Sequence, residues 1–405
     1  MGRLRIVLVT RRYWPLVGGT ERLIGTLAEQ WREQGAEPIV VTAQWEQHWP
    51  FAVSQFLVPV VRLPQPQVRA WGTVKYLWSL NRWLRANREK YDAVLVSGLK
   101  EDAYAAVVTA TGFRPPVPVI LRAERAGTEG DCRWQETAQF GSRIRQRCRA
   151  ANAIIAPNEN VVEELTAAGF EKDRIEHIPN GVTLPEPRTD ATRNAARLSL
   201  GEIHSDLKTG QTTTVAVYAG HLRDGKGLHD LVRAWRKIVE VLSDARLWLI
   251  GEGAERSDLY HRIRDCNLQY HVLMPGAFDD VTEFLQAADV FVAPAHEEGT
   301  SLGILEAMAA GLPVVATGLP SHERLLGSRF PADSPRGFLV PRKNSLALAE
   351  AIAQVFTLRD EAHRRAELAR QFVAESHSIE RMAQGHYELI ERLVAQLGSK
   401  SGKEL

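Results

Sequence analysis

Short apolar runs alternate with longer helical stretches along almost the whole chain. These runs are rich in Val and Ile and show no strict alternation of polar and apolar residues. Strands of that kind are buried on both faces, and their alternation with helices favours parallel sheets with right-handed crossovers. The expected strands are 5–10, 37–42, 92–97, 118–121, 153–156, 215–220, 246–251, 271–274, 289–294 and 313–317. The clearest expected helices are 21–34, 72–90, 227–242, 255–265, 301–310 and 345–358.

A break near the middle divides this pattern in two. Residues 179–213 hold Pro and Gly turns and a polar stretch with little strand character. We therefore predict an α/β protein with two doubly wound Rossmann-like domains, 1–185 and 186–375, that face each other across a cleft. An amphipathic helix over 376–398 follows them. Ligands of such sheets bind outside the carboxyl ends of the strands, so functional residues are expected in the loops that follow strands.

The charge balance argues against wholesale binding to nucleic acid, because 50 Lys and Arg face 49 Asp and Glu. Residues 1–90 are an exception, with 13 basic and 6 acidic residues, and eight of the ten tryptophans lie at or before Trp134. Such a region can contact an anionic membrane or an amphipathic ligand. The alternative is a solvated basic face with its tryptophans in the core.

The cysteines and the apolar runs bear on the cellular compartment. Three scattered cysteines, Cys132, Cys148 and Cys266, favour a reducing cytoplasm over a disulfide framework. No apolar run approaches the roughly 18–20 residues of a membrane span. We expect a cytoplasmic protein, with peripheral contact at the inner face of the membrane as an option. No CxxC, HExxH or D-x-D sequence occurs, so no metal or other cofactor is implied.

The segment 294–317 carries the strongest signal for a site. A strand ends at Pro294, and Thr300 or Ser301 can cap the helix that follows. The free amides at the start of that helix, near Ser301, Leu302 and Gly303, can hold a phosphate or a sugar hydroxyl. Glu298 precedes the helix, and Glu306 lies about 7.5 Å along its axis. That is about the span from a diphosphate to a ribose diol, which a carboxylate binds well.

A second segment, 217–238, contains GHLRDGKG between an expected strand and an expected helix. The string nearly matches the phosphate loop of nucleoside triphosphatases, but Gly227 stands where Ser or Thr should bind magnesium. Arg223 and Lys226 remain suited to neutralise a diphosphate. An ordinary basic surface turn is the alternative. Gly18 and Gly19, which follow the first strand, are a weaker signal for close approach to a ligand.

The chain resembles glycosyltransferase family 4, whose retaining enzymes have the glycosyltransferase B (GT-B) fold. The resemblance covers nearly the whole chain and rests on GGTE, AIIAPNENVVEEL, HIPNGV, VYAGHLRDGKGL, LIGEG and EEGTSLGILEAMAAGLPVVAT. It implies a nucleoside-diphosphate sugar in the cleft, mostly on the second domain. It also implies that Glu298 contacts the donor sugar, Glu306 the ribose, and Lys226 the diphosphate, with Gly19 approaching from the first domain.

Two positions depart from the family pattern. His221 stands where the family commonly has Arg, and Arg223 is the alternative phosphate-binding residue. Glu124 stands where the family often has a His that contacts the donor sugar. The choice of nucleotide base is expected to depend on the loop backbone near Gly251–Gly253 and near Gly276–Phe278.

The expected reaction is transfer of a sugar from the nucleotide to a saccharide, lipid-linked or small-molecule acceptor, with retained configuration. Lys226, Arg223 and the helix amides would stabilise the leaving diphosphate. Acceptor binding is expected on the first domain, at Trp45–Trp49 or at 69–90, a segment that mixes tryptophans with basic residues. Two alternatives stay open: an inactive nucleotide-sugar-binding or scaffold protein, and a phosphate-loop nucleoside triphosphatase.

Overall fold

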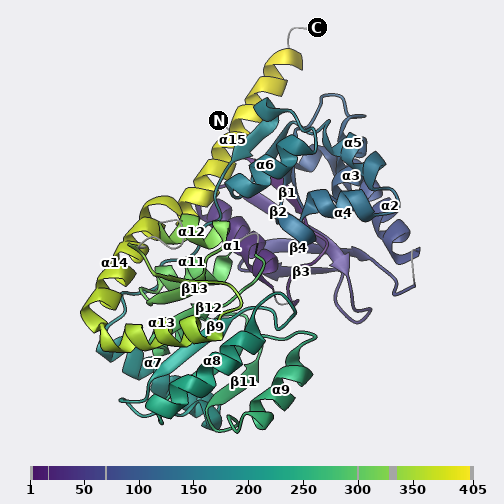
Figure 1. Ribbon diagram of the computed structural model, residues 1–405. Coiled ribbons are helices and arrows are strands. Elements are labelled where there is room, and N and C mark those ends of the chain that lie inside the picture. Colours follow the sequence, from purple (N-terminus) through teal and green to yellow (C-terminus); the bar gives the residue numbers. More distant parts are fainter. Residues whose placement is uncertain (1–2, 17, 69–70, 299–300, 328–334, 402–405) are drawn as a thin grey trace. The chain divides into compact units, whose positions relative to one another are not determined.

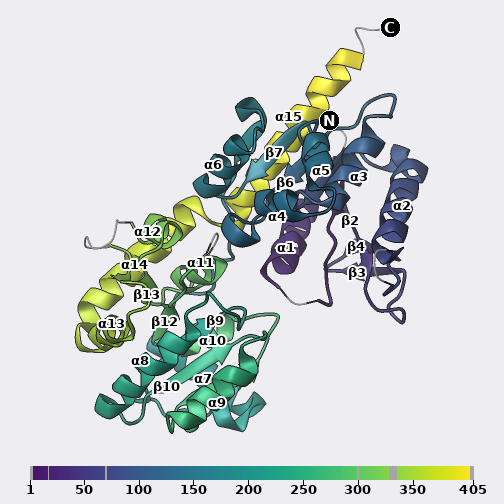
Figure 2. The same ribbon diagram turned by 45° about the vertical axis from the view of Figure 1, so that its right-hand side comes forward.

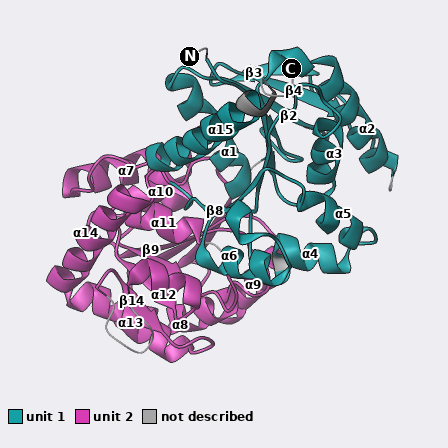
Figure 3. Ribbon diagram, turned by 90° about the horizontal axis from the view of Figure 1, so that it is seen from above, with its two compact units in different colours: residues 1–181, 379–405 teal, residues 182–378 magenta. Residues whose placement is uncertain are grey.

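The computed structural model describes residues 3–16, 18–68, 71–298, 301–327 and 335–401. The chain divides into two compact units (Figure 3). Unit 1 contains Met1–Gly181 together with Ile379–Leu405, and unit 2 contains Val182–Ser378. Each unit is a largely parallel sheet with helices on both faces (Figures 1 and 2). The predicted α/β class with two Rossmann-like domains is therefore confirmed.

Unit 1 is built on one sheet with the strand order β3-β4-β2-β1-β5-β6-β7-β8 among its described residues. All neighbours pair in parallel except β3 and β4, which form an antiparallel hairpin at the edge. The strands are β1 (Arg5–Val9), β2 (Glu37–Gln44), β3 (Ala52–Gln55), β4 (Val58–Pro64), β5 (Ala93–Ser97), β6 (Val119–Arg122), β7 (Ala153–Ala156) and β8 (Ile175–His177). The helices are α1 (Gly19–Glu33), α2 (Trp71–Ala86), α3 (Glu101–Ala110), α4 (Asp131–Thr137), α5 (Gly141–Cys148), α6 (Glu159–Ala167) and α15 (Ile379–Ser401), with short 3-10 turns at Arg88–Lys90, Gly127–Glu129 and Lys172–Arg174.

The last helix, α15, belongs to unit 1 although almost two hundred residues of unit 2 precede it in the chain. It packs on α1, where the fully buried Trp31 donates its indole N–H to the carbonyl of Ala383 over 3.0 Å. Met382, Ala383 and Ile390 are buried on the same side of α15. Their helical spacing is the amphipathic pattern that the sequence shows.

Unit 2 is a parallel sheet with the order β11-β10-β9-β12-β13-β14 among its described residues. Successive residues of β9 face opposite cores, because strand side chains alternate. Val215 and Val217 pack with α7, α10 and α11, whereas Ala216 and Tyr218 pack with α8, α9 and α13. The strands are β9 (Val215–Ala219), β10 (Arg246–Ile250), β11 (Val272–Gly276), β12 (Val290–Ala293), β13 (Val314–Thr317) and β14 (Phe338–Val340). The helices are α7 (Asp190–Ile203), α8 (Leu228–Val241), α9 (Arg256–Asp265), α10 (Thr282–Ala287), α11 (Leu302–Ala309), α12 (Pro320–Leu326), α13 (Ser345–Thr357) and α14 (Arg359–Ser376), with a 3-10 turn at Ser205–Leu207.

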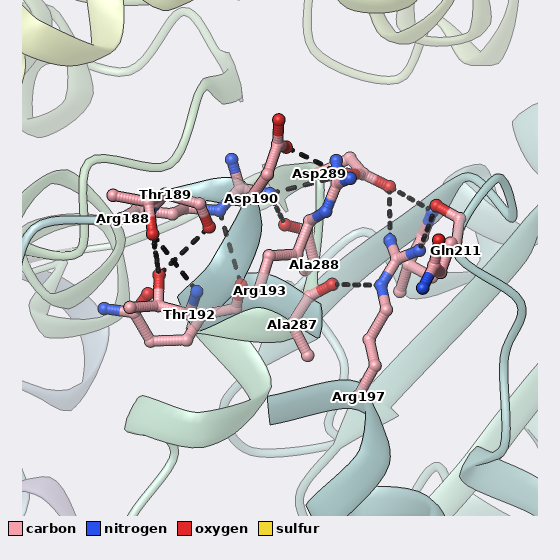
Figure 4. Close-up of polar contacts among 12 residues, drawn as sticks. Arg188, Thr189, Asp190, Thr192, Arg193, Arg197, Gln211, Ala287, Ala288 and Asp289 are labelled. Carbon is pink, nitrogen blue, oxygen red and sulfur yellow. Dashed lines mark hydrogen bonds and ion pairs between the residues drawn. The ribbon is translucent and has the colours of Figure 1, made fainter. Parts of the chain in front are cut away.

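An arginine cluster around Asp289 ties α7 to the sheet of unit 2 (Figure 4). Asp289, just before β12, accepts from Arg197 at 2.8 Å and lies 3.3 and 3.4 Å from Arg193 and Arg188. Arg197 also donates to the carbonyl of Ala287, at the end of α10. These contacts lie at the amino ends of β9 and β12. The cluster therefore stabilises the fold at the end of the sheet opposite the carboxyl ends of the strands, where ligands of such sheets bind.

The junctions between the units lie a few residues from the expected domain ends at 185 and 375. The two chain crossings run together, because the backbone N–H of Val182 donates to the carbonyl of His377 over 2.9 Å. The expected helix 376–398 begins instead at Ile379, since α14 continues to Ser376. The expected helix 72–90 ends at Ala86 and gives way to a 3-10 turn. Strands β3, β4, β8 and β14 are not among the predicted strands.

Candidate functional site

The strand order of unit 2 reverses at β9, which has β10 on one side and β12 on the other. Loops that leave the carboxyl ends of such neighbours diverge and open a binding crevice. The loop after β9 carries Arg223 and Lys226, and the loop after β12 carries Glu298. The topology thus brings together two segments that the sequence analysis selected independently.

Lys226 and Glu298 form a close ion pair beyond the carboxyl ends of β9 and β12. The ammonium nitrogen of Lys226 donates to Oε1 of Glu298 over 2.7 Å, and both side chains are largely buried. Burial by itself would raise the pKa of Glu298, but hydrogen bonds and charge from His322 and Lys226 outweigh it and lower the pKa to about 2. Glu298 is therefore a fixed carboxylate at neutral pH.

His322 is the second partner of Glu298, and the sequence analysis did not identify it. Its Nε2 lies 3.2 Å from Oε2 of Glu298, and its Nδ1 lies 2.8 Å from the carbonyl oxygen of Thr317. The ring is fully buried at the start of α12. Each ring nitrogen thus lies within hydrogen-bonding distance of an oxygen atom, and the ring connects Glu298 to the backbone at the end of β13. A histidine near a helix start is common in sequences, and only the contact with Glu298 distinguishes this one.

The backbone at Gly227 bears on whether the turn after β9 can act as a magnesium-binding phosphate loop. Its φ is +67°, a conformation that glycine adopts readily and other residues rarely. A Cβ at this position would overlap the carbonyl oxygen of Pro294. The Ser or Thr that a nucleoside triphosphatase needs therefore does not fit this backbone, which weakens that alternative further.

Charged side chains surround a pocket of about 170 Å³ beside the same turn. The buried Asp230 pairs with Arg233 and lies 2.6 Å from Nε2 of His296, whose backbone N–H donates to the carbonyl of Gly225. These contacts connect the β12 loop to the β9 loop. Both loops are predicted from the sequence, but the side chains of Asp230, Arg233 and His296 are not. The pocket is lined by Arg223, Asp224, Gly225, Gly227, Leu228, His229, Asp230, Arg233, Glu255, His296 and Lys343.

Helix α11 provides the second part of the predicted site. It begins at Leu302, with Ser301 as its N-cap residue, and Glu306 lies within it. Of the two predicted capping residues, Ser301 occupies the N-cap position, but its buried hydroxyl makes no capping bond and has no partner among the described atoms. Thr300 lies outside the described residues. Gly303 lies close to the backbone of β9, since a Cβ there would be 3.1 Å from the carbonyl oxygen of Ala219.

The glycines after β10 let two loops approach each other. Gly251 has a φ of +144°, and a Cβ on it would overlap the carbonyl oxygen of Gly220. A Cβ on Gly253 would likewise overlap the carbonyl of Leu222. Their positions follow from backbone packing, and their contact with a nucleotide base stays a prediction. His221 is exposed, and its carbonyl accepts a hydrogen bond from Tyr218.

Unit 1 places Glu124 just beyond the carboxyl end of β6. The hydroxyl of Ser97, at the end of β5, donates to the Glu124 carboxylate over 2.7 Å. The backbone N–H of Glu124 donates to the carboxylate of Asp131 over 2.8 Å. Burial and the nearby charge of Asp131 raise the pKa of Glu124. Gly19 is the first residue of α1.

Arg11 and Asp102 form a largely buried ion pair beyond the carboxyl ends of the unit 1 strands, and the sequence did not predict it. Arg11 follows β1 and lies 3.2 Å from Asp102 at the start of α3. Burial raises the pKa of Asp102 to about 6, against the opposing charge of Arg11. The indole N–H of Trp45 donates to the Arg11 carbonyl over 2.9 Å. Trp45, which is predicted to help bind the sugar acceptor, is thus held in place by the backbone of its own unit.

Two kinds of feature are absent from the described residues. Within the described ranges, no helix combines the length and the apolarity that crossing a bilayer requires. The same part of the chain holds no group of three or more His, Cys, Asp or Glu side chains arranged to bind a metal ion.

Family models match both halves of the chain. Residues 17–185 match the model described as Glycosyltransferase Family 4, and residues 201–372 match the model described as Glycosyl transferases group 1.

Curated relatives match over part of their length. The chain is 31% identical over 185 residues to the lipopolysaccharide core biosynthesis glycosyltransferase LpsE of Rhizobium meliloti, which covers 45% of this chain and 52% of that protein. It is 28% identical over 186 residues to an Escherichia coli UDP-Gal:alpha-D-GlcNAc-diphosphoundecaprenol alpha-1,3-galactosyltransferase, with 45% of each covered. The aligned region spans about half the length of these relatives.

Solved structures match over nearly the whole chain. Sucrose-phosphate synthase from Thermosynechococcus elongatus has a TM-score of 0.78 at 19% identity, covering 97% of this chain and all of that one. HepE of Anabaena, in complex with UDP-glucose, has a TM-score of 0.75 at 18% identity, covering 96% of this chain and all of that one. At these identities the likeness shows a shared fold.

Proposed function

This chain belongs to glycosyltransferase family 4, with the GT-B fold, and from that premise we propose that it transfers a sugar from a nucleoside-diphosphate sugar with retention of configuration. The observation that carries the proposal is the Lys226–Glu298 pair at the strand-order reversal of unit 2. A cation and an ionised carboxylate side by side at the carboxyl ends of β9 and β12 suit a ligand in which a diphosphate is joined to a sugar. The UDP-glucose complex of HepE, which shares the fold, supports the same ligand class.

In this proposal Lys226 and Arg223 stabilise the negative charge that develops on the leaving diphosphate. The backbone amides at Ser301, Leu302 and Gly303 add donors, as helix starts do for anions. Interactions that strengthen as charge develops accelerate the reaction, whereas uniform binding does not. The residues thus act on the leaving group, and we propose that no metal is required for this role.

Glu298 is proposed to bind the donor sugar as a permanent anion. With a pKa of about 2 it carries no proton to donate at neutral pH, so it does not serve as a general acid. Its contacts with Lys226 and His322 hold both oxygens, which favours positioning and stabilisation of the oxocarbenium-like transition state over nucleophilic attack. The acceptor hydroxyl then loses its proton to the departing phosphate on the same face of the sugar.

The remaining site residues complete the donor and acceptor sites. Glu306 is proposed to bind the ribose hydroxyls, and Gly251 and Gly253 to border the base. We propose that unit 1 binds the acceptor, a saccharide, lipid-linked sugar or small molecule, and that Glu124 and Gly19 contribute to sugar and phosphate contacts. Cys132, Cys148 and Cys266 carry free thiols, which supports action in the reducing cytoplasm.

The test is the thermal stability of the purified protein with UDP, GDP and ADP and their sugar conjugates. A ligand that binds only the folded state raises the melting temperature by mass action. We expect one nucleotide series to stabilise the wild type and Lys226→Met to lose that shift. Lys237→Met, on the exposed face of α8, is the matched control and should keep it.

Each other outcome counts against the proposal. No stabilisation by any nucleotide in a folded sample favours the scaffold alternative, as does binding without transfer to any acceptor. Magnesium-dependent ATP hydrolysis favours the nucleoside triphosphatase. Loss of transfer activity in EDTA, with recovery on adding a divalent metal, contradicts the metal-independent role of Lys226 and Arg223.

A further inference from the structure

Residues 47–88 contain six Lys and Arg and no Asp or Glu, although Asp and Glu make up 49 of the 405 residues. This acid-free segment forms the β3–β4 hairpin and α2, at one side of unit 1 (Figure 1). It also holds many of the large apolar side chains that unit 1 exposes to solvent. They are Phe51, Phe56, Leu57, Val68, Trp71, Val74 and Trp78.

Helix α2 carries the densest part of this surface, on a face that its own unit does not use. Its inner face is anchored by Tyr76, Leu80 and Leu84, which are buried in the core of unit 1. On the opposite face Trp71 is 56% exposed and Trp78 is 61% exposed. The packing of α2 on its unit is therefore complete without the two tryptophans.

The same outer face is basic. Trp71, Val74 and Trp78 lie at positions i, i+3 and i+7, so they form one stripe along the helix. Lys75, Arg82 and Arg85 are exposed along the same stripe. The guanidinium of Arg82 lies 5.6 Å from the ring centre of Trp78, so the cationic and aromatic groups are intermixed.

The structure corrects which residues of 69–90 are available for binding. Tyr76 is fully buried, and Trp83 is half-buried and stacks on Tyr91 with ring centres 6.5 Å apart. Among the described aromatics of α2, the exposed pair is Trp71 and Trp78. Arg69 lies outside the described residues. The outer face is thus narrower and more sharply amphipathic than the sequence alone indicates.

We propose that this outer face of α2, defined by Trp71, Val74, Lys75, Trp78, Arg82 and Arg85, binds the surface of an anionic membrane. Tryptophan prefers the boundary between lipid headgroups and acyl chains, where its ring is buried and its N–H stays hydrated. Lysine and arginine beside it attract anionic headgroups and extend their charged ends to the interface. The helix lies in the plane of the membrane, because its other face is fixed to the unit.

The charge of the segment identifies the occupant. An anionic bilayer presents a broad negative surface, and a helix face without any carboxylate meets it without repulsion. The interaction does not depend on the proposed transferase activity, since it needs neither donor nor acceptor. If both hold, the surface brings the enzyme to lipid-linked acceptors.

The experiment is sedimentation of the full chain with phosphatidylcholine vesicles, with and without phosphatidylserine, at low salt and without nucleotide. We expect binding to the vesicles that contain phosphatidylserine, and weaker binding as salt screens the charges. Trp71→Ser with Trp78→Ser should reduce the partition coefficient at least tenfold. Lys75→Glu with Arg82→Glu and Arg85→Glu should reduce it about a hundredfold, since each surface cation contributes roughly fivefold.

The matched controls are changes of the same kind elsewhere on the surface. Arg143→Glu with Arg147→Glu reverses two exposed arginines on α5 and should leave vesicle binding close to the wild type. Tyr270→Ser removes an exposed aromatic ring of unit 2 and should also have little effect. Circular dichroism melting curves show whether each variant is folded before its binding is compared.

Several results overturn the proposal. One is the absence of binding to vesicles containing phosphatidylserine at low salt. A second is an equal loss of binding in the α5 variant, which indicates attraction by net charge alone. A third is unchanged binding in the tryptophan variant. A fourth is a wild-type dimer that Trp78→Ser dissociates, because a second copy of the chain then covers this face.

Discussion

Replacing Glu298 by Gln tests whether the paired carboxylate supports both stability and catalysis. Gln has nearly the same shape but no charge, so it removes the ion pair with Lys226 and weakens the hydrogen bond with His322. Glu298 has 17% of its side chain exposed, so solvent screens these interactions little. The variant is therefore expected to lose folding free energy as well as turnover.

The size of the stability loss follows from the pKa. The pKa of Glu298 is lowered from 4.5 to about 2, and each unit corresponds to roughly 1.4 kcal/mol, so ionisation stabilises the folded state by about 3 kcal/mol. In a unit of this length a change of that size lowers the melting temperature by roughly 6–12 °C. Loss of one preorganised electrostatic group typically lowers kcat by about 10²–10³-fold.

The pH dependence gives the prediction its sign. A carboxylate with a lowered pKa stabilises the folded state above its ordinary pKa, and this stabilisation is lost as the pH falls through the folded-state value. The melting temperatures of wild type and Glu298→Gln should differ fully at pH 7. The difference should shrink below pH 4.5 and disappear near pH 2. Calorimetry across this range measures it, with a transfer assay at neutral pH.

Glu297→Gln is the control, because Glu297 is the exposed neighbour and carries the same substitution. It should leave the melting temperature and the turnover nearly unchanged. The reasoning is refuted if Glu298→Gln melts like the wild type at pH 7. It is also refuted if the difference between the two persists unchanged at acid pH, since another mechanism would then account for it.

Three further changes have defined outcomes. Gly227→Ser should lower the melting temperature, because its Cβ overlaps a carbonyl, and should not produce magnesium-dependent nucleotide hydrolysis in a phosphate-release assay. Asp289→Asn should cost about 3–5 kcal/mol in urea unfolding, because it removes the carboxylate that Arg188, Arg193 and Arg197 share. The exposed Asp190→Asn, which removes a second carboxylate from Arg193 alone, should cost under about 1 kcal/mol. Trp31→Phe removes the hydrogen bond to Ala383 and should accelerate hydrogen exchange in α15.

Much of the fold could be predicted because it depends on local pattern. Buried parallel strands are continuous apolar runs, and each strand predicted from such a run is present, within a few residues of its expected ends. The missed strands lack that signal. Strand β14 has three residues, β8 mixes Ile with two polar residues, and β4 has Pro59 and Pro64 near its two ends. A proline lacks the backbone N–H that a ladder hydrogen bond needs, and near the ends of a strand this loss affects few bonds.

The site was predicted in part for the same reason. Lys226 and Glu298 lie in strings whose turn and helix signals are local, so the sequence could select each of them. Their contact depends on the adjacency of β9 and β12, which comes from the strand order. His322, 24 residues beyond Glu298, reaches it because α12 follows the next strand of the sheet, and no local spacing encodes that contact.

The amino-acid sequence by itself determined the α/β class, most strands, the two-unit organisation and the two loops that hold the cation and the carboxylate. Those features arise from hydrophobic periodicity and turn chemistry within short windows. The tertiary structure alone decided which side chains meet. It paired Glu298 with Lys226 and His322, made Gly227 obligatory through a carbonyl of another loop, and left Trp71 and Trp78 outside while burying Tyr76. Burial and long-range contact depend on how distant segments pack, which a one-dimensional pattern does not contain.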